Sequence, residues 1–159
     1  MSTTSQSSFF VRIIELPPVK MARSGRGDLD AFDQWWSALD AQRKNRLCPH
    51  DFMWFNPKLG NLEWLYVLEE GVTDTAGYEV FDFPGGLYAV AACKDEDPET
   101  EETTQLIRQW VTASERFALA PESSGRYEMA HVITPLNGKE LLGYHQLDLF
   151  IPIVDKDAE

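Results

Sequence analysis

The segment LDLFIPI, residues 147–153, alternates aliphatic side chains with an acid, an aromatic ring and a proline. Side chains two residues apart on a β-strand share one face of the sheet. The aliphatic side chains therefore predict a buried face on which helices pack. Asp148 and Phe150 must then point to the opposite face, where an acid and an aromatic ring suit a cationic ligand, with cation–π attraction of about 0.5–2 kcal/mol. The alternative for Asp148 is a strand charge that only faces water.

Hydrophobic spacing predicts two helices upstream of this strand. Apolar residues three and four apart indicate a first helix over residues 28–46. A second helix is expected to begin near Asp97, because Pro98 fits the first helical position, and its apolar stripe extends to Phe117. The other apolar segments predict strands at residues 9–16, 19–23, 52–55, 64–68, 78–83, 87–93, 127–133 and 145–154.

The order of these elements indicates an internal duplication. Strand, helix and two strands occur over residues 9–68 and again over residues 87–154, without visible residue identity between the halves. We therefore expect an α+β domain in which duplicated β-α-β-β halves form one antiparallel sheet with two helices on one face. The other face must be solvated or form a binding surface. Residues 1–8 are expected to be disordered, residues 9–154 to form the domain and residues 155–159 to be a tail.

The charge balance disfavours one class of partner and favours another. The chain has 26 acidic and 14 basic residues, which gives a net charge of −12. Such a field repels a phosphate backbone, so direct nucleic-acid binding is not expected. The same field attracts cationic ligands or a basic protein surface, unless it serves solubility alone.

Sequence motifs for metals, cofactors and membranes are missing. The run Cys48-Pro49-His50-Asp51 holds possible metal ligands, but no partner cluster accompanies it, so no metal site is expected. Nucleotide-binding glycine loops and the hydrolase nucleophile elbow are absent, so no cofactor is predicted. The sequence shows no signal-peptide pattern and no apolar run of the roughly 18 residues that span a bilayer. With Cys48 and Cys93 interpreted as reduced thiols, these features favour a cytoplasmic protein that does not contact membranes.

Other side chains are candidates for the face that carries Phe150. In the segment 64–67, Trp64 and Tyr66 share one face. The chain has more aromatic residues than two helices on one sheet face would need, although most of these rings could be packing residues. Glu128 lies in an expected strand, where acids are depleted, so it contacts a ligand, transfers a proton or faces water.

Several segments together resemble a known family. The segment FPGGLYAV, residues 83–90, looks like the opening of the second half of GyrI-like domains, which are also called effector-binding domains of bacterial transcription activators. The resemblance covers nearly the whole chain and is carried by the order and spacing of several segments. The further matching positions are residues 11–17, Trp110, Ser114, Tyr127, Glu128 and residues 149–153.

The resemblance implies a duplicated fold of the SHS2 type with a ligand cleft between the two halves. In that family, aromatic side chains line the cleft and an acidic residue meets cationic drugs. Transferred to this chain, the position on the second helix is Trp110 and the two acids are Glu128 and Asp148. Asp148 is a departure, because the family usually has the longer glutamate there.

The resemblance also implies three functional classes. Some family members are sensor domains fused to a DNA-binding helix-turn-helix, for which we expect no room in this chain. Others are acidic standalone proteins that inhibit DNA gyrase, which the charge of −12 matches. A third group resembles hydrolases that open the cyclopropane rings of genotoxic natural products.

We predict a standalone bacterial protein that binds hydrophobic or cationic aromatic small molecules, including multiple drugs, in the cleft between the halves. One alternative is a cyclopropane hydrolase, in which Glu128 or Asp148 protonates the leaving oxygen and the other acid orients water. Another alternative is an acidic inhibitor of DNA gyrase, with a protein as its partner. The expected ligand-binding residues are Trp64, Tyr66, Trp110, Tyr127, Glu128, Asp148 and Phe150.

Overall fold

The computed structural model of the chain describes residues 9–44 and 49–157. Three expectations lie outside the described residues: those for residues 1–8, for Cys48 and for the last two residues of the tail. The first helix ends at Asp40, earlier than the expected Arg46, because the chain turns at residues 41–42.

In the described part of the chain, nine strands form one antiparallel sheet, with three helices beside it. The strands are β1 (Arg12–Leu16), β2 (Val19–Arg23), β3 (Asp51–Asn56), β4 (Asn61–Val67), β5 (Glu79–Phe83), β6 (Gly86–Lys94), β7 (Phe117–Leu119), β8 (Met129–Val132) and β9 (Gln146–Asp155). The helices are α1 (Leu29–Asp40), α2 (Asp97–Ala113) and α3 (Gly138–Leu142), and a 3₁₀ turn spans Glu122–Ser124. The α+β class expected from the sequence is therefore confirmed.

Two elements, β7 and α3, were not anticipated. Phe117 was expected in the apolar stripe of the second helix, but α2 ends at Ala113 and Phe117 begins β7 beside β9. Ser114 accounts for the break, because its backbone is extended. Its hydroxyl also accepts hydrogen bonds from the backbone N–H groups of Arg116 and Phe117, both at 3.0 Å.

The order of strands in the sheet agrees with the expected β-α-β-β halves, β2-α1-β3-β4 and β6-α2-β8-β9, and adds one strand to each. The order is β1-β6-β9-β8-β3-β4-β2-β5. Counted outward from the middle of the sheet, one half has the strands β8, β9, β6 and β1. The equivalent positions in the other half are those of β3, β4, β2 and β5. Each repeat is therefore β-β-α-β-β, and its first strand, β1 or β5, pairs with the other half of the molecule. The second repeat begins with β5, earlier in the chain than the expected residue 87.

The exchanged strands cross between the halves at two neighbouring turns. Pro17 and Pro18 join β1 to β2, while Pro84 and Gly85 join β5 to β6. Gly85 has a φ of +72°, and a Cβ atom there would lie 2.6 Å from the carbonyl oxygen of Leu16. The two passes of the chain are thus in backbone contact, which glycine permits because it has no side chain and adopts positive φ freely.

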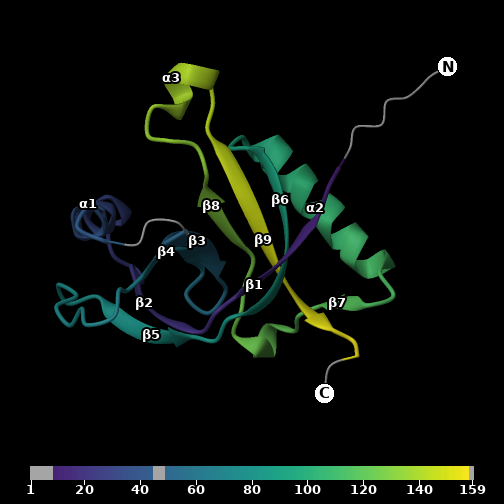
Figure 1. Cartoon of the computed structure of the whole chain (residues 1–159), viewed down its shortest axis with the longest axis horizontal. Helices are drawn as coiled ribbons and strands as arrows, with labels where there is room; N and C mark the ends of the chain where they lie inside the picture. Colours follow the sequence, from purple (N-terminus) through teal and green to yellow (C-terminus); the bar gives the residue numbers. More distant parts are fainter. Residues whose placement is uncertain (1–8, 45–48, 158–159) are drawn as a thin grey trace.

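Both α1 and α2 lie on one face of the sheet, as the alternation on the last strand predicted. Leu149 of β9 packs in the apolar core beneath α2. Leu149 pairs with Ala130, Ala130 with Met53, and Met53 with Trp64 on successive strands. Because paired residues share a face, all four side chains lie on this face. Trp64 packs beneath α1, where its ring centroid lies 5.7 Å from that of Trp36. Figure 1 shows α1 over one half of the sheet and α2 over the other.

The opposite face of the sheet is concave and encloses a second core. Strands that are distant in the sheet order meet on this face, since the rings of Phe83 on β5 and Tyr88 on β6 are stacked 6.4 Å apart. A ligand site on this face must therefore lie at the edge of the core. The buried residues of the concave core are Met21, Phe52, Trp54, Leu65, Phe83, Tyr88, Val90, Met129 and Phe150.

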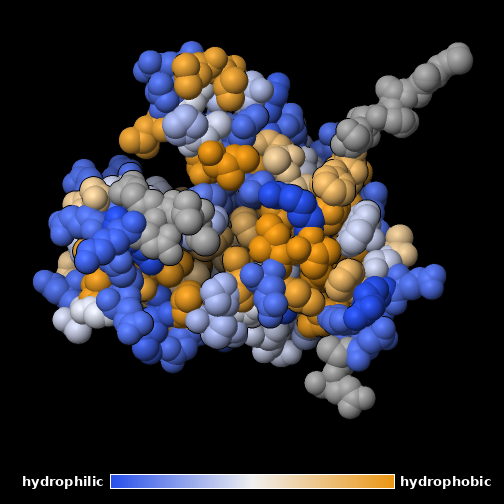
Figure 2. Space-filling view, in the orientation of Figure 1, coloured by the Kyte–Doolittle hydropathy of each residue, from blue (hydrophilic) through white to orange (hydrophobic). Residues whose placement is uncertain are grey.

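The outer surface differs between the two halves. In Figure 2 the half around α1 and β5 is largely hydrophilic, whereas apolar side chains gather over β1 and β6. Ile13 of β1 is among the exposed apolar residues. No helix in the described part of the chain is long and apolar enough to cross a membrane. The apolar gathering lies at the β1 edge of the sheet.

The crossing at Gly85 generates a prediction about stability. We expect Gly85→Ala to destabilise the fold by about 2–5 kcal/mol, since the new Cβ adds a left-handed backbone penalty to a clash with backbone atoms that cannot rotate away. Gly143→Ala is the matched control, because Gly143 also has a positive φ, of +88°, but has no atom within 4 Å of its Cβ position. That variant should lose only about 1–2 kcal/mol in urea-induced unfolding. Equal losses in the two variants would contradict the close backbone contact.

Candidate functional site

The β3–β4 hairpin brings an acid, an indole ring and an amide onto the concave face. Its turn has the sequence NPKLGN, residues 56–61, in which the N–H of Gly60 donates to the carbonyl of Asn56 at 2.8 Å. This turn sets a register in which Trp54 lies opposite Glu63. Trp54 belongs to the concave core, so Glu63 and Asn56 share that face.

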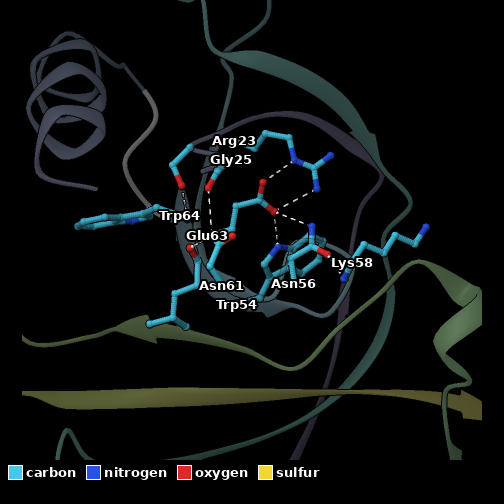
Figure 3. A network of polar contacts seen from close by, with 10 residues as sticks. Arg23, Gly25, Trp54, Asn56, Lys58, Asn61, Glu63 and Trp64 are labelled. Carbon is cyan, nitrogen blue, oxygen red and sulfur yellow. Dashed lines mark hydrogen bonds and ion pairs between the residues drawn. The ribbon is translucent and has the colours of Figure 1, made fainter. Parts of the chain in front are cut away.

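Glu63 is a fully buried carboxylate with donors on both oxygens. Arg23 Nε donates to Oε2 at 2.8 Å, and Arg23 Nη2 donates to Oε1 at 3.1 Å. Trp54 Nε1 and Asn56 Nδ2 donate to Oε1 at 2.9 Å and 3.1 Å. Figure 3 shows these side chains converging on Glu63. Burying a charge is costly unless the charge is paired and hydrogen-bonded, and Glu63 meets both conditions.

These contacts keep both members of the pair charged. Burial alone raises the pKa of the Glu63 carboxyl, but the hydrogen bonds from Arg23, Trp54 and Asn56 outweigh burial and leave that pKa below its usual range. Burial likewise lowers the pKa of Arg23, but Glu63 and, more weakly, Glu79 outweigh burial and raise it. The site therefore holds a carboxylate and a guanidinium at neutral pH.

An open cavity of about 510 Å³ lies beside this network, within the usual size range of small-molecule sites. The guanidinium carbon of Arg23 lies 4.2 Å from the ring centroid of Phe81. Tyr127 and Trp54 meet edge to face, with their centroids 4.8 Å apart. Because Tyr127 comes from the second half of the chain, the cavity draws on both halves. The other lining residues of this paragraph come from three strands, with Arg23 on β2, Trp54 on β3 and Phe81 on β5.

Tyr127 and Phe150 are the expected site residues that pack in the concave core. Tyr127 lines the cavity itself. Phe150 lies on the concave face, as expected, but its side chain is fully buried. Its ring packs edge-on against Phe52 and Tyr88, with centroids 5.4 Å and 5.9 Å apart. Phe150 is thus part of the concave core and does not line the cavity.

Glu128 and Asp148 do not meet in one cavity. Glu128 forms an ion pair with Arg108 of α2, in which Arg108 Nε donates to Oε2 at 2.6 Å, beside a second cavity of about 370 Å³. Asp148 accepts a hydrogen bond from Arg12 Nη2 at 2.7 Å. The Arg12–Asp148 pair lines a third cavity, of about 410 Å³. Each acid therefore has its own arginine in a different place.

The three remaining expected residues lie on the helix-bearing face. Trp64 Nε1 donates to Asp51 Oδ2 at 3.0 Å. The hydroxyl of Tyr66 donates to Asp40 Oδ1 at 3.0 Å, and burial raises the pKa of Tyr66 to about 12. Trp110 lies on α2, where it stacks against Phe117 and is 39% exposed. These contacts are those of packing residues beneath and beside the helices.

Sequence reasoning did not identify Glu63 or Arg23. Glu63 carries the same local signal that drew attention to Glu128, an acid inside an apolar strand, in the segment NLEWLYV at residues 61–67. Its partner Arg23 lies 40 residues earlier, at the end of another strand. Only the pairing of β2 with β4 brings the two side chains together.

Comparison with solved structures shows the same fold in another protein, EcmrR. The crystal structure of the EcmrR C-terminal domain superposes with a TM-score of 0.63 at 12% identity, over 92% of this chain and 98% of that chain. The EcmrR chain in the cryo-EM structure of the EcmrR-DNA complex in EcmrR-RPo gives a TM-score of 0.61 at 10% identity, over 91% of this chain. This chain spans only 57% of that longer one.

The family was identified from the sequence match. No curated protein matches the chain. A family model described as Cass2, integron-associated effector binding protein, matches residues 49–153, which is more than half of the chain. The matched segment includes Glu63, Trp54 and Tyr127 of the cavity. The chain therefore belongs to the family of integron-associated effector-binding proteins, in agreement with the GyrI-like effector-binding domain indicated by its sequence.

Proposed function

We propose that this chain binds hydrophobic or cationic aromatic small molecules in the 510 Å³ cavity beside Glu63. The observation that carries the proposal is a fully buried carboxylate at the edge of an aromatic cavity that opens to solvent. Membership of an effector-binding family supports a small-molecule ligand of some kind. The cavity chemistry narrows that ligand to planar aromatic molecules, preferably cations.

The lining offers two attractions to such a ligand. The faces of Phe81 and Tyr127 supply dispersion and cation–π attraction, the latter worth about 0.5–2 kcal/mol. Glu63 supplies a negative charge in a poorly hydrated place, where charge–charge attraction is stronger than in water. The net charge of −12 adds long-range attraction for cations.

The positions of the other expected residues decide which of them belong to the proposed site. Tyr127 keeps its proposed role in ligand binding, and Phe150 supports the cavity from within the concave core. A hydrolase that uses Glu128 and Asp148 on one substrate is not favoured, because these acids line different cavities. Binding through Glu63 is therefore the function that the geometry supports best.

The role of Glu63 can be measured by calorimetric titration with N-methylacridinium, a planar and permanently charged aromatic. We expect Glu63→Gln to weaken binding about tenfold or more, equivalent to roughly 1.4 kcal/mol, because the charge is lost while the shape is kept. Neutral acridine, titrated at about pH 8, should lose much less affinity, since only the charge term changes. Thermal melting of the variant serves to show that it remains folded.

Matched acid variants complete this experiment. Glu128→Gln and Asp148→Asn each remove one carboxylate from a strand or its edge, as Glu63→Gln does, but outside this cavity. Both should bind N-methylacridinium with wild-type affinity. Loss of binding in either of them, with Glu63→Gln unaffected, would return the site to the residues expected from the sequence.

The low pKa of Glu63 predicts how binding depends on pH. A carboxyl whose pKa lies below its usual range stays ionised at mildly acidic pH, so its attraction for a cation disappears only when the pH falls through that low value. The affinity for N-methylacridinium should therefore be constant from about pH 8 to about pH 5. A titration midpoint between those limits would assign the essential charge to a different group.

A further inference from the structure

We infer that Arg23 is an internal ligand of the cavity: its guanidinium occupies the cation position beside Glu63, and a cationic ligand binds by displacing it. This inference rests on the proposed function and adds the residue that controls access to the acid. It also specifies the ligand class as planar, delocalised cations, such as amidinium, guanidinium or N-alkylated aromatic groups.

The contacts of Arg23 are those that a planar amidinium or guanidinium ligand would make, and an N-alkylated aromatic ring would share the stacking contact. Two of its N–H groups form a fork on the two oxygens of Glu63, at 2.8 Å and 3.1 Å. Its planar face lies over Phe81, with 4.2 Å between the guanidinium carbon and the ring centroid. One side chain thus satisfies the acid and covers the aromatic ring of the cavity. A compact ammonium would not reproduce both contacts, because it has neither a fork nor a flat face.

An additional cation meets a carboxylate that is already neutralised. Within the described residues, the ion pair of Glu63 is formed with Arg23. The neighbouring Arg26 makes a different contact, in which its Nη1 donates to the carbonyl of Leu59 at 2.9 Å. Charge attraction between Glu63 and a ligand therefore requires Arg23 to leave first.

The side chain of Arg23 can move toward solvent, and a second carboxylate lies within its reach. Its side chain is 19% exposed, while that of Glu63 is fully buried, so Arg23 forms the solvent side of the pair. Glu79 lies opposite Arg23 in the β2–β5 register, is exposed and lines the same cavity. Cross-strand neighbours on one face lie within reach of long side chains. The guanidinium can therefore exchange Glu63 for Glu79 without becoming unpaired.

The backbone around Arg23 is held while its side chain moves. The hydroxyl of Ser24 accepts a hydrogen bond from the N–H of Trp64 at 2.9 Å. The carbonyl of Gly25 accepts one from Asn61 Nδ2 at 3.1 Å. Figure 3 shows Gly25 beside Asn61, and together these contacts hold the segment after β2 against the start of β4. Displacement thus needs only side-chain rotation, and the cavity walls stay in place.

The affinity of the wild-type chain for a cation therefore depends on the fraction of molecules in which Arg23 has left Glu63, and a small fraction means weak binding. When only a minor state is competent to bind, the apparent dissociation constant rises by the inverse of its population. Cations that replace neither the fork nor the stacking contact fail to compete with Arg23. Arg23 is therefore a specificity-determining residue of the cavity.

The test is calorimetric titration of N-methylacridinium and benzamidinium into the wild-type chain and into Arg23→Ala. We expect the affinity for N-methylacridinium to rise on the order of tenfold in the variant, because no displacement step remains. Benzamidinium, whose planar amidinium can form the same fork on Glu63, should bind the variant more tightly than the wild type by a similar factor. Benzoate, which has a similar shape and the opposite charge, should gain nothing.

Two further variants separate charge from space and from general effects. In Arg23→Ala with Glu63→Gln the gain for cations should vanish, and a gain that persists would mean that added space alone is responsible. Arg116→Ala is the matched control, because Arg116 forms a similar fork on Asp155, at 2.7 Å and 2.9 Å, away from the cavity. We expect that control to bind as the wild type does.

The outcomes distinguish this inference from the proposed function. Wild-type binding with unchanged or weaker binding in Arg23→Ala overturns the internal ligand and leaves the proposed function standing. No binding of either cation to either chain overturns both. If Arg23→Ala does not fold, Arg23→Lys takes its place, since lysine keeps the charge but loses the fork and the flat face. That variant should gain about threefold or more in affinity, and no gain counts against the inference.

Discussion

The backbone contact at Gly85 is the constraint on which the rest of the structure depends. Pro17-Pro18 and Pro84-Gly85 carry the chain between the two halves in opposite directions, and the two passes touch where a side chain on Gly85 would not fit. Each half therefore contains a strand that the other half contributes. This exchange brings Phe83 and Tyr88 together and encloses most of the concave face. Only the edge of that face stays open, and the cavity beside Glu63 lies there.

The buried ion pair at this edge is explained better by the proposed ligand binding than by a contribution to stability. Replacing a buried ion pair by apolar side chains of similar volume is often neutral or stabilising, so such a pair is weak evidence of a role in stability. Arg108–Glu128 and Arg12–Asp148 are partly exposed pairs of the kind that contributes little. The carboxylate of Glu63, by contrast, is removed from water and lies beside an open aromatic cavity, where it is paired with Arg23. A carboxylate in that setting suits recognition of a cation.

Local periodicity anticipated much of the fold but little of the site. The alternation along β9 placed Leu149 beneath α2 and Phe150 on the opposite face, because strand geometry forces side chains two apart onto one side. The end of α2 was missed, since the apolar stripe continues to Phe117 and only the extended backbone at Ser114 interrupts it. The exchange of first strands was also missed, because strand order alone does not say with which half a strand pairs.

The sequence by itself determined the family, the α+β class and the faces on which residues of each strand lie. These properties follow from local spacing and composition, which every segment carries within itself. The tertiary structure alone decided which acid belongs to the cavity. Glu63 and Glu128 have similar local settings, but β2 brings Arg23 to Glu63 across 40 residues of chain, and α2 brings Arg108 to Glu128 on the helix-bearing face. The chemistry of a carboxylate depends on its partners and its burial, and both are set by long-range packing.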